Sequence, residues 1–476
     1  MVTAAQHDAA LRSLADSFSR LDPTVPVRLA KGTTNLFRPR AAAMGPGLDV
    51  SLLTGVLDVD PVERTATVQG MATYERVVDA TLAAGVMPLV VPQLRTITVG
   101  GAVTGLGIEA SSFRNGLPHE SVRSLDILVG TGEIVTAAPT GPHADLYRAF
   151  PNSYGSLGYA VSLTIEVEPV APFVRLRHVA FDSLGTLTDA IGHLVTARAW
   201  DGEPVDFLDG VVFARNAAYL TLGRFEQTLD AAETPSDYAG QRIFYRSIRE
   251  QATDLLTVRD YLWRWDTDWF WCSRAFGVQH PVVRRLWPRQ LKRSDVYQRI
   301  VGLENRYHLA ARVDAWRGGP ARERVVQDVE IPLERTADFL DWFLREVPIE
   351  PIWLCPVALR EPGIAGSAGT RAPDVGAPDS DAPWPLYPMH RGETYVNVGF
   401  WSSVPISPGR ADGDVNRDIE GVVSQLGGHK SLYSDAYYSR DEFESRYGGS
   451  VYEDVKKRYD PDGRFPGLYD KAVRRR

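Results

Sequence analysis

The feature that most constrains this chain is a glycine-rich segment at residues 92–116, with the sequence PQLRTITVGGAVTGLGIEASSFRNG. It contains five glycines and several serine and threonine residues, and little in it predicts a regular helix or strand. Glycines let backbone N–H groups come close to a phosphate, and hydroxyl side chains add further hydrogen-bond donors. The segment therefore predicts a loop that holds the diphosphate group of a dinucleotide.

Two other interpretations of this segment stay open. Residues Gly105–Ala110 fit the G-x-G-x-x-A pattern of Rossmann folds, and Asp126 stands about twenty residues later, where that fold places a ribose-binding acid. The pattern requires a strand before it and a helix after it, and the flanking Gly100-Gly101 and Ser111-Ser112 favour neither. The second alternative is a loop whose glycines are purely structural.

Along the rest of the chain, short strand-like runs alternate with helical ones. Within residues 25–170, Thr65–Gly70 alternates like a half-buried strand, and Tyr74–Ala84 has helical spacing that ends at Gly85. From Val174 onward, strand–helix–strand units repeat. This order predicts an α+β fold in which an antiparallel sheet has helices on one face.

The composition excludes several classes of protein. The net charge of −8 argues against nucleic-acid binding, because that affinity comes from Lys and Arg. Two distant cysteines and nine scattered histidines predict neither a disulfide framework nor a metal site. The sequence has no apolar run of about 18 residues and no signal-peptide pattern. We therefore expect a cytoplasmic, metal-free protein that does not bind nucleic acid.

Four short motifs stand out in the first third of the chain, namely Val99-Gly100-Gly101, Arg123-Ser124-Leu125 before a predicted hairpin, Asp145-Leu146-Tyr147 and Gly155-Ser156-Leu157-Gly158. Together they resemble the flavin domain of the vanillyl-alcohol oxidase superfamily. A further set looks like the Δ24-sterol reductase group of that superfamily. It includes Val91–Leu94, Gly107–Ser112, Val325–Asp328, Pro351–Pro356, Leu432–Tyr437 and Gly449–Tyr452. The resemblance covers roughly residues 25–170 and 320–470.

The resemblance implies a particular division of the chain. Residues 1–172 would form an FAD-binding domain of the PCMH type, built from two α+β subdomains. Residues 173–430 would form an antiparallel-sheet substrate (cap) domain, with a Trp/Arg-rich insertion at 245–324 and a flexible loop at 362–383. Residues 431–476 would complete the flavin domain.

The same resemblance implies that the chain binds FAD. The first flavin loop would be Lys31–Asn35, and because no histidine stands near it, we expect the cofactor to be non-covalent. The predicted cofactor-binding residues are Lys31, Gly32, Thr33, Thr34, Asn35, Pro92, Thr98, Val99, Gly100, Gly101, Gly105, Gly107, Ile108, Glu109, Ser111, Ser112, Gly158 and Ile165.

The candidate catalytic residues follow from the chemistry of reducing a carbon–carbon double bond. That reaction needs a hydride on one carbon and a proton on the other, so a buried acid with a tuned pKa is expected. In the predicted strand Glu393–Gly399, a period of two places Glu393, Tyr395 and Asn397 on one face. With His308 they are the predicted catalytic residues. The alternatives are a solvent-facing side of the sheet and a structural histidine.

The Trp/Arg-rich middle of the chain has three interpretations. Trp263, Trp265 and Trp269–Trp271 could line a pocket for a long apolar substrate. With Arg264 and Arg274 beside them, they could instead rest on a membrane surface, where the basic groups hold lipid headgroups. The third interpretation is an ordinary aromatic core with exposed arginines.

The resemblance implies a flavin-dependent reductase of a carbon–carbon double bond in a lipid. Bacterial relatives of the group reduce 10-methylene to 10-methyl fatty acyl chains of phospholipids, so this substrate is predicted, with NADPH as the electron donor. A methyltransferase is then an expected partner, and peripheral contact with the inner membrane an expected location. The alternatives are a Δ24-sterol-type reductase, an FAD-dependent alcohol or sugar oxidase, and a flavin- or lipid-binding protein without turnover.

Overall fold

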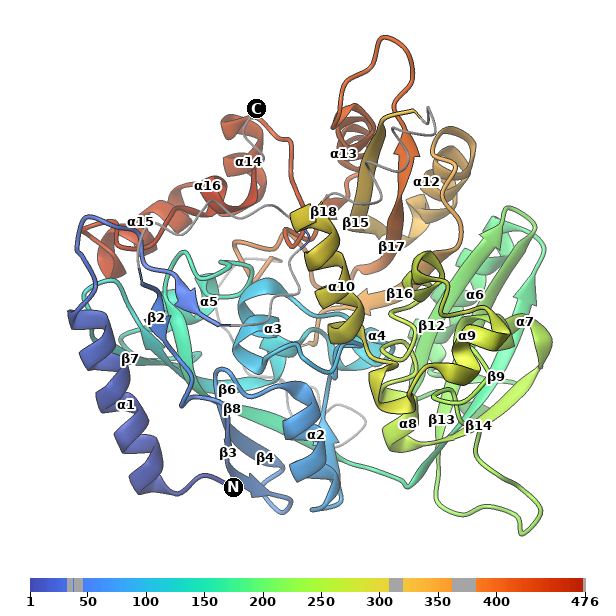
Figure 1. Ribbon diagram of the computed structural model, residues 1–476, viewed down its shortest axis with the longest axis horizontal. Coiled ribbons are helices and arrows are strands. Elements are labelled where there is room, and N and C mark those ends of the chain that lie inside the picture. Colours follow the sequence, from blue (N-terminus) through green and yellow to red (C-terminus); the bar gives the residue numbers. More distant parts are fainter. Residues whose placement is uncertain (32–36, 38–45, 308–319, 362–381, 474–476) are drawn as a thin grey trace.

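Two large antiparallel sheets organise the chain (Figure 1). This computed structural model describes residues 1–31, 37, 46–307, 320–361 and 382–473. In the first sheet the strand order is β3-β4-β8-β6-β7, and β5 also pairs with β8. The strands are β3 (Val56–Asp60), β4 (Thr65–Gln69), β5 (Val86–Pro88), β6 (Val122–Leu128), β7 (Ile134–Ala137) and β8 (Tyr159–Pro169). Strand β8 is buried along nearly its whole length because it lies in the middle of this sheet.

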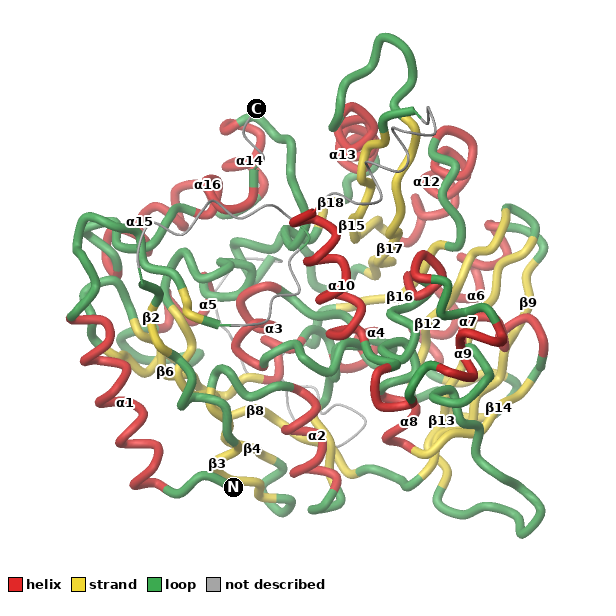
Figure 2. Tube along the Cα trace, in the orientation of Figure 1, coloured by secondary structure: helices red, strands yellow, loops and turns green. Residues whose placement is uncertain are grey.

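Short helices and a small parallel pair of strands surround the first sheet (Figure 2). The pair is β1 (Leu29–Ala30) with β2 (Leu48–Asp49). The helices are α1 (Ala4–Ser19), α2 (Tyr74–Leu82), α3 (Val99–Gly105), α4 (Ser112–Asn115) and α5 (Ala144–Ala149). Helix α1 begins after Thr3, whose side chain and that of Gln6 form a capping box.

The glycine-rich segment is more regular than its sequence predicts. It contains α3 and α4, where we expected no regular element. Helix α3 begins at Val99 because Thr98 Oγ1 accepts a hydrogen bond from the Gly101 amide. The Rossmann interpretation is wrong, because a helix and not a strand leads into Gly105.

The second sheet has eight strands in the order β14-β9-β13-β12-β16-β17-β15-β18. They are β9 (Phe173–Phe181), β12 (Phe207–Ala214), β13 (Ala217–Glu226), β14 (Thr253–Thr257), β15 (Arg322–Pro332), β16 (Ile352–Ala358), β17 (Thr394–Pro405) and β18 (His429–Lys430). All of its strand pairs are antiparallel. A separate two-stranded pair, β10 (Ala199–Trp200) with β11 (Glu203–Pro204), lies outside this sheet.

Helices α6 (Leu184–Ala197), α12 (Leu333–Glu346) and α13 (Asp414–Gln425) cover one face of the second sheet. Their apolar side chains, such as Leu187 and Phe343, share one core with strand residues such as Val398. The predicted α+β class with an antiparallel sheet is confirmed, but helices are not limited to this face, because a further helical segment packs on the other one.

The segment from α7 to α10 packs on the opposite face of the second sheet. Its helices are α7 (Phe244–Glu250), α8 (Val258–Leu262), α9 (Pro281–Leu286) and α10 (Ser294–Tyr307). Phe270 contacts Trp353 of β16 and Trp401 of β17, with ring centroids 5.4 and 4.4 Å apart. The side chains of Trp263, Trp265 and Trp269–Trp271 are all buried. A membrane contact through these aromatic residues is therefore wrong, since none of them reaches the surface.

The C-terminal helices return to the first sheet (Figure 1). They are α14 (Arg440–Arg446), α15 (Gly449–Tyr459) and α16 (Leu468–Ala472). Lys456 Nζ donates to Ser156 O at 2.7 Å, and Lys471 Nζ donates to Gly155 O at 2.7 Å. Most of the predicted loop 362–383 lies outside the described residues. Among the described helices, none is both long and apolar enough to cross a membrane.

Candidate active site

A cavity of about 690 Å³ lies where the two sheet units meet. One part of its lining comes from α3 and its flanking loops, and a second part from the C-terminal segment. A third part comes from the second sheet and the aromatic segment packed on it. The cavity is thus shared between regions that are far apart in the sequence.

Eight of the predicted cofactor-binding residues line this cavity. They are Lys31, Pro92, Thr98, Gly100, Gly101, Gly105, Gly107 and Ile108. Six others are not among its lining residues, namely Val99, Glu109, Ser111, Ser112, Gly158 and Ile165. Gly32, Thr33, Thr34 and Asn35 lie outside the described residues.

The predicted cofactor-binding residues that do not line the cavity take part in packing and in structural hydrogen bonds. Val99 and Ile165 belong to the apolar core. Ser111 Oγ donates to Leu89 O at 2.8 Å, and Ser112 Oγ accepts from the Glu109 amide at 3.1 Å. The Glu109 carboxylate is buried and receives a hydrogen bond from Arg264. These groups therefore shape the segment and do not face the cavity.

The amides at the start of α3 are already bonded within the protein. The Val99 amide donates to Ala72 O and the Gly100 amide to Gly70 O, both at 2.9 Å. A Cβ atom at Gly100 would lie 2.7 Å from that carbonyl oxygen, so glycine permits a close contact between helix and sheet. The expectation that these amides wrap a diphosphate is corrected accordingly, because their bonds go to the backbone.

Other groups in the cavity remain suited to a diphosphate. Thr96 lines the cavity, and its hydroxyl is shielded from solvent with no hydrogen-bond partner among the described residues. The side chains of Arg28, Lys31 and Lys471 supply positive charge to the lining. Leu106, also in the lining, has a left-handed φ of 61°, a strained conformation that is often found at binding sites. A dinucleotide diphosphate fits this donor set.

We expect Thr96→Val to weaken FAD binding about tenfold, because it removes one donor without changing the shape of the side chain. The dissociation constant of the apoprotein for FAD, measured by quenching of flavin fluorescence, checks this. Thr131→Val, at an exposed hairpin turn, is the matched control and should leave the constant unchanged. Equal constants for both variants would mean that Thr96 does not contact the cofactor.

The lining from the second sheet unit is largely aromatic. It contains Trp269, Phe270, Trp353 and Trp401, and Phe37 and Tyr433 join it from other parts of the chain. The Phe37 ring stacks on Trp269 with centroids 5.6 Å apart, and the Phe37 amide donates to Tyr433 O at 3.0 Å. This wall offers an apolar surface to a ring or a hydrocarbon chain.

Asp328 on β15 is the acidic group of this aromatic wall. In the sheet it lies opposite Gly399, where a Cβ atom would overlap with the Asp328 carboxylate. Glycine at 399 therefore makes room for the carboxyl group. Burial raises the pKa of Asp328 to about 7, while hydrogen bonds with Asn397 and Tyr433 act in the opposite direction. Such a carboxyl group can carry a proton at neutral pH.

Tyr433 and Trp401 extend the hydrogen-bond network around this carboxyl group. Trp401 Nε1 donates to the Tyr433 hydroxyl at 3.0 Å, and Tyr433 is a hydrogen-bond partner of Asp328. Burial, followed by the charge of Asp328, raises the pKa of Tyr433 well above its usual value. Tyr433 therefore stays protonated and can donate to the carboxylate form of Asp328.

The predicted catalytic residues lie only partly in this region. Asn397 Nδ2 is 3.5 Å from Asp328 Oδ1, so Asn397 supports this carboxyl group. Tyr395 is buried outside the lining and donates its hydroxyl proton to Glu393 at 2.7 Å. The prediction that Glu393 is a catalytic acid is corrected. Its side chain is exposed just before β17 and does not line the cavity. His308 lies outside the described residues.

Asp328, Tyr433 and Trp401 are the residues that sequence reasoning missed as candidates for chemistry. One signal was present, since the polar residues Gln327, Asp328 and Glu330 interrupt an apolar strand, VVQDVEIP. Carboxylates inside a buried strand are rarely tolerated without a partner or a function.

Comparison with known proteins agrees with this geometry. Residues 9–138 match the family model described as "FAD binding domain". The human Delta(24)-sterol reductase is 24% identical over 433 residues, which cover 89% of this chain and 77% of that protein. The enzyme of that name from Arabidopsis thaliana is 25% identical over 460 residues, with 90% and 77% covered. Cytokinin dehydrogenase 9 of Oryza sativa is 26% identical over 171 residues, with 36% and 32% covered.

The glycine-rich segment lies within the residues that match the FAD-binding model. The predicted resemblance to PCMH-type flavoproteins of the Δ24-sterol reductase group is therefore confirmed. The chain has an FAD-binding domain and is an FAD-dependent oxidoreductase.

Proposed function

We propose that this protein reduces a carbon–carbon double bond in the hydrocarbon chain of a lipid. The proposed substrate is a 10-methylene fatty acyl chain of a phospholipid, and the proposed electron donor is NADPH. The observation that carries the proposal is Asp328, a half-buried acid with a raised pKa on the aromatic wall of a cavity whose other wall belongs to the FAD-binding domain.

The chemistry divides between the cofactor and the protein. When bound and reduced, FAD would supply the hydride that adds to one alkene carbon. Asp328 supplies the proton that adds to the other alkene carbon, and its anion is then stabilised by Asn397 and Tyr433. Trp269, Phe270 and the other rings keep water from the reacting carbons. Protonation of the terminal methylene carbon leaves positive charge on the more substituted carbon, which is the favourable direction.

Lys31, Thr96 and Lys471 are the residues proposed to hold the diphosphate of FAD. The attachment is proposed to be non-covalent, because none of the described lining residues is a histidine. His119, the histidine nearest to the glycine-rich segment in sequence, packs on Trp384 with ring centroids 4.5 Å apart. A methyltransferase that builds the methylene branch is the proposed source of the substrate, and the cytoplasmic side of the inner membrane is the proposed location.

An anaerobic reduction tests this function. Purified protein is mixed with NADPH and with phospholipid that carries 10-methylene chains. The molecular mass of the extracted lipid is then measured by mass spectrometry. We expect bleaching of the flavin absorbance and a lipid heavier by two hydrogen atoms. Rapid oxygen consumption with a polyol and no response to NADPH would make the protein an oxidase. A flavin that stays oxidised with NADPH and every lipid would make it a binding protein.

A sterol side chain is the second candidate substrate. The similarity to Delta(24)-sterol reductases along most of the chain favours it. The same assay with a Δ24-sterol in place of the phospholipid distinguishes the two, since the faster oxidation of the reduced flavin identifies the substrate.

A further inference from the structure

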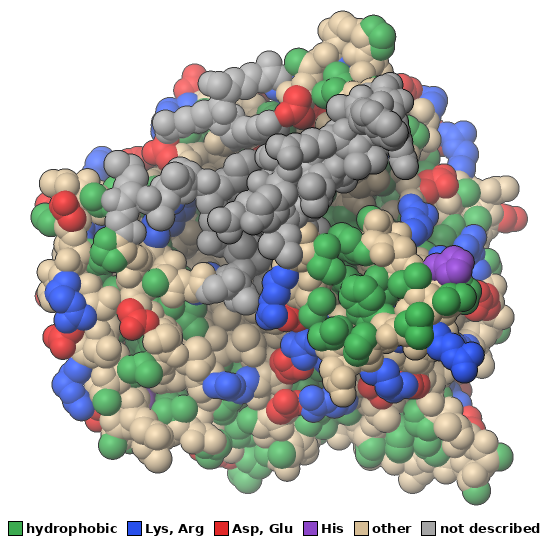
Figure 3. Space-filling model, viewed as in Figure 1, with side chains coloured by type: hydrophobic (Ala, Val, Ile, Leu, Met, Phe, Trp, Pro, Cys, Tyr) green, Lys and Arg blue, Asp and Glu red, His purple; other side chains and the backbone are tan. Residues whose placement is uncertain are grey.

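An apolar patch lies on the surface around α9, away from the aromatic wall. We call it the α9 patch and define it by four exposed residues, Val282 (60% exposed), Val283 (37%), Leu286 (78%) and Leu291 (43%). Figure 3 shows apolar side chains gathered on the side where α8, α9 and α10 lie, with basic side chains at the border. Single exposed apolar residues are common, but a cluster of this kind marks a contact surface.

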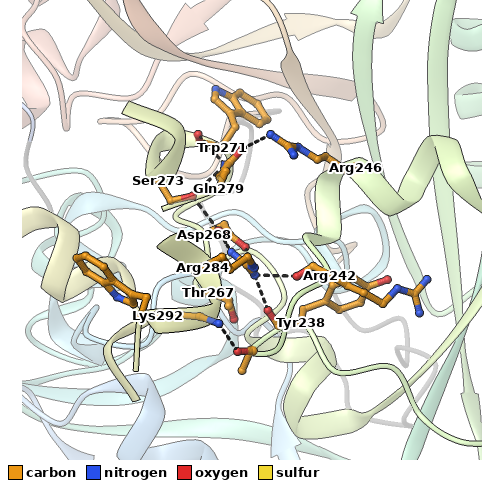
Figure 4. Close-up of polar contacts among 12 residues, drawn as sticks. Tyr238, Arg242, Arg246, Thr267, Asp268, Trp271, Ser273, Gln279, Arg284 and Lys292 are labelled. Carbon is orange, nitrogen blue, oxygen red and sulfur yellow. Dashed lines mark hydrogen bonds and ion pairs between the residues drawn. The ribbon is translucent and has the colours of Figure 1, made fainter. Parts of the chain in front are cut away.

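The opposite side of α9 is fixed to the interior by a buried arginine (Figure 4). Arg284 donates to both oxygens of Asp268, at 2.7 and 3.0 Å. It also donates to the carbonyl groups of Tyr238, Gly240 and Arg242. Because every side of this guanidinium is bonded, α9 has a fixed orientation with its apolar side chains outward.

Two more contacts fix the ends of this region (Figure 4). Lys292 Nζ donates to Ala239 O and Gly240 O, both at 2.8 Å. Before α9, Gln279 Nε2 donates to Ser273 Oγ at 2.9 Å. The exposed apolar residues are therefore held on a rigid frame, and they do not belong to a fraying surface loop.

The charge around the patch differs in sign from that of the whole chain. Residues 272–300 contain seven Lys and Arg against one Asp, whereas the chain has a net charge of −8. Of these seven, Arg284 and Lys292 are buried, and Arg293 and Arg299 pair with Asp295. Arg274 and Arg285 are exposed. Arg289 is also exposed and pairs with Asp237 at the surface. Apolar side chains that emerge among basic ones suit a surface with anionic headgroups above a hydrocarbon layer.

We infer that the α9 patch docks this protein on the surface of an anionic lipid bilayer. Val282 and Leu286 enter the boundary between headgroups and acyl chains, and the arginines contact the headgroup phosphates. The same segment begins at Cys272, which lines the cavity, so the docking surface and the cavity wall form one continuous piece of chain. The inference concerns binding alone and stands whether or not the proposed reaction is correct.

Vesicle co-sedimentation tests the inference with the full chain. We expect binding to vesicles rich in phosphatidylglycerol, weaker binding to pure phosphatidylcholine, and loss of binding as salt screens the arginines. The double variant Val282→Asp/Leu286→Asp should bind the anionic vesicles at least roughly tenfold more weakly. Circular dichroism and the flavin spectrum of the variant should match those of the wild type.

The matched control places the same substitutions at exposed apolar residues elsewhere. Leu52 is 58% exposed and Val62 is 85% exposed, and neither belongs to the α9 patch. Leu52→Asp/Val62→Asp should bind vesicles as the wild type does. Equal loss in both double variants, or a wild type that stays in the supernatant, would overturn the inference. So would light scattering that shows the α9 patch variant to split a dimer without any change in vesicle binding.

Discussion

Asp328→Asn should slow the reduction of the alkene by a factor of about 10² to 10⁴, the usual contribution of a positioned acid. The amide fills the same space beside Gly399 but has no proton to give at neutral pH. Reduction of the flavin by NADPH should be unchanged, because that step needs no proton from the aromatic wall. Stopped-flow absorbance, with each half-reaction started separately, measures both rates.

The pH dependence should identify the same group. The raised pKa of Asp328, about 7, keeps a large part of the carboxyl groups protonated at neutral pH. The alkene step should therefore be fast below pH 7 and slow progressively above it. In Asp328→Asn this dependence should disappear along with most of the rate.

Glu393→Gln provides the contrast for this prediction. Glu393 is exposed and is not a lining residue of the cavity, so its amide variant should reduce the alkene at the wild-type rate. If Glu393→Gln lost the alkene step and Asp328→Asn kept it, the position of the acid inferred from the cavity would be wrong.

Arg264→Met should lower the free energy of unfolding by about 3–5 kcal/mol, which is typical when one partner of a buried ion pair is removed. The Arg264 guanidinium is fully buried and donates to Glu109 at 2.9 Å and Asp209 at 2.8 Å. Without it, two buried carboxylates lose their counter-charge. Because Glu109 belongs to the FAD-binding unit and Asp209 to the second sheet, contact between these units should also weaken.

Urea unfolding followed by tryptophan fluorescence measures this loss, since Trp265 Nε1 donates to Asp209 at 2.9 Å. Arg259→Met is the matched control, because Arg259 pairs with Asp79 and both side chains are about half exposed. It should cost less than about 1 kcal/mol. A loss in Arg264→Met no larger than in this control would contradict the structural role of the buried cluster.

The sequence could predict the α+β class because local periodicity carries that information. Strand β4 and helix α2 begin where the alternation at Thr65 and the helical spacing at Tyr74 predict. Helix α3 could not be predicted, because Gly100 is favoured by its close contact with the Gly70 carbonyl and not by helix propensity.

The sequence could indicate which residues of β17 share a face, but not which of them line the cavity. Asn397 and Trp401 lie on one face of the strand, as a period of two requires, yet Trp401 lines the cavity and Glu393 does not. Trp401 stands eight positions after Glu393, and a strand rises about 3.3 Å per residue, so the two side chains lie far apart along the strand. The register with β15, which places Asp328 opposite Gly399, decides this position and cannot be read from one strand.

The tryptophan-rich segment shows a similar limit. Aromatic residues beside arginines are typical of both a pocket wall and a membrane contact, so composition could not separate them. The structure buries Trp269 and Phe270 through a turn in which both residues have positive φ, at 46° and 58°. The exposed apolar residues follow later in the chain, on α9 and in the turn after it.

The central claim is that the cavity beside α3 holds FAD, and the absorbance spectrum of the purified protein tests it most directly. We expect the two bands of oxidised flavin, with FAD released intact when the protein is denatured by acid, as non-covalent binding requires. A colourless protein that takes up no added FAD would contradict the claim.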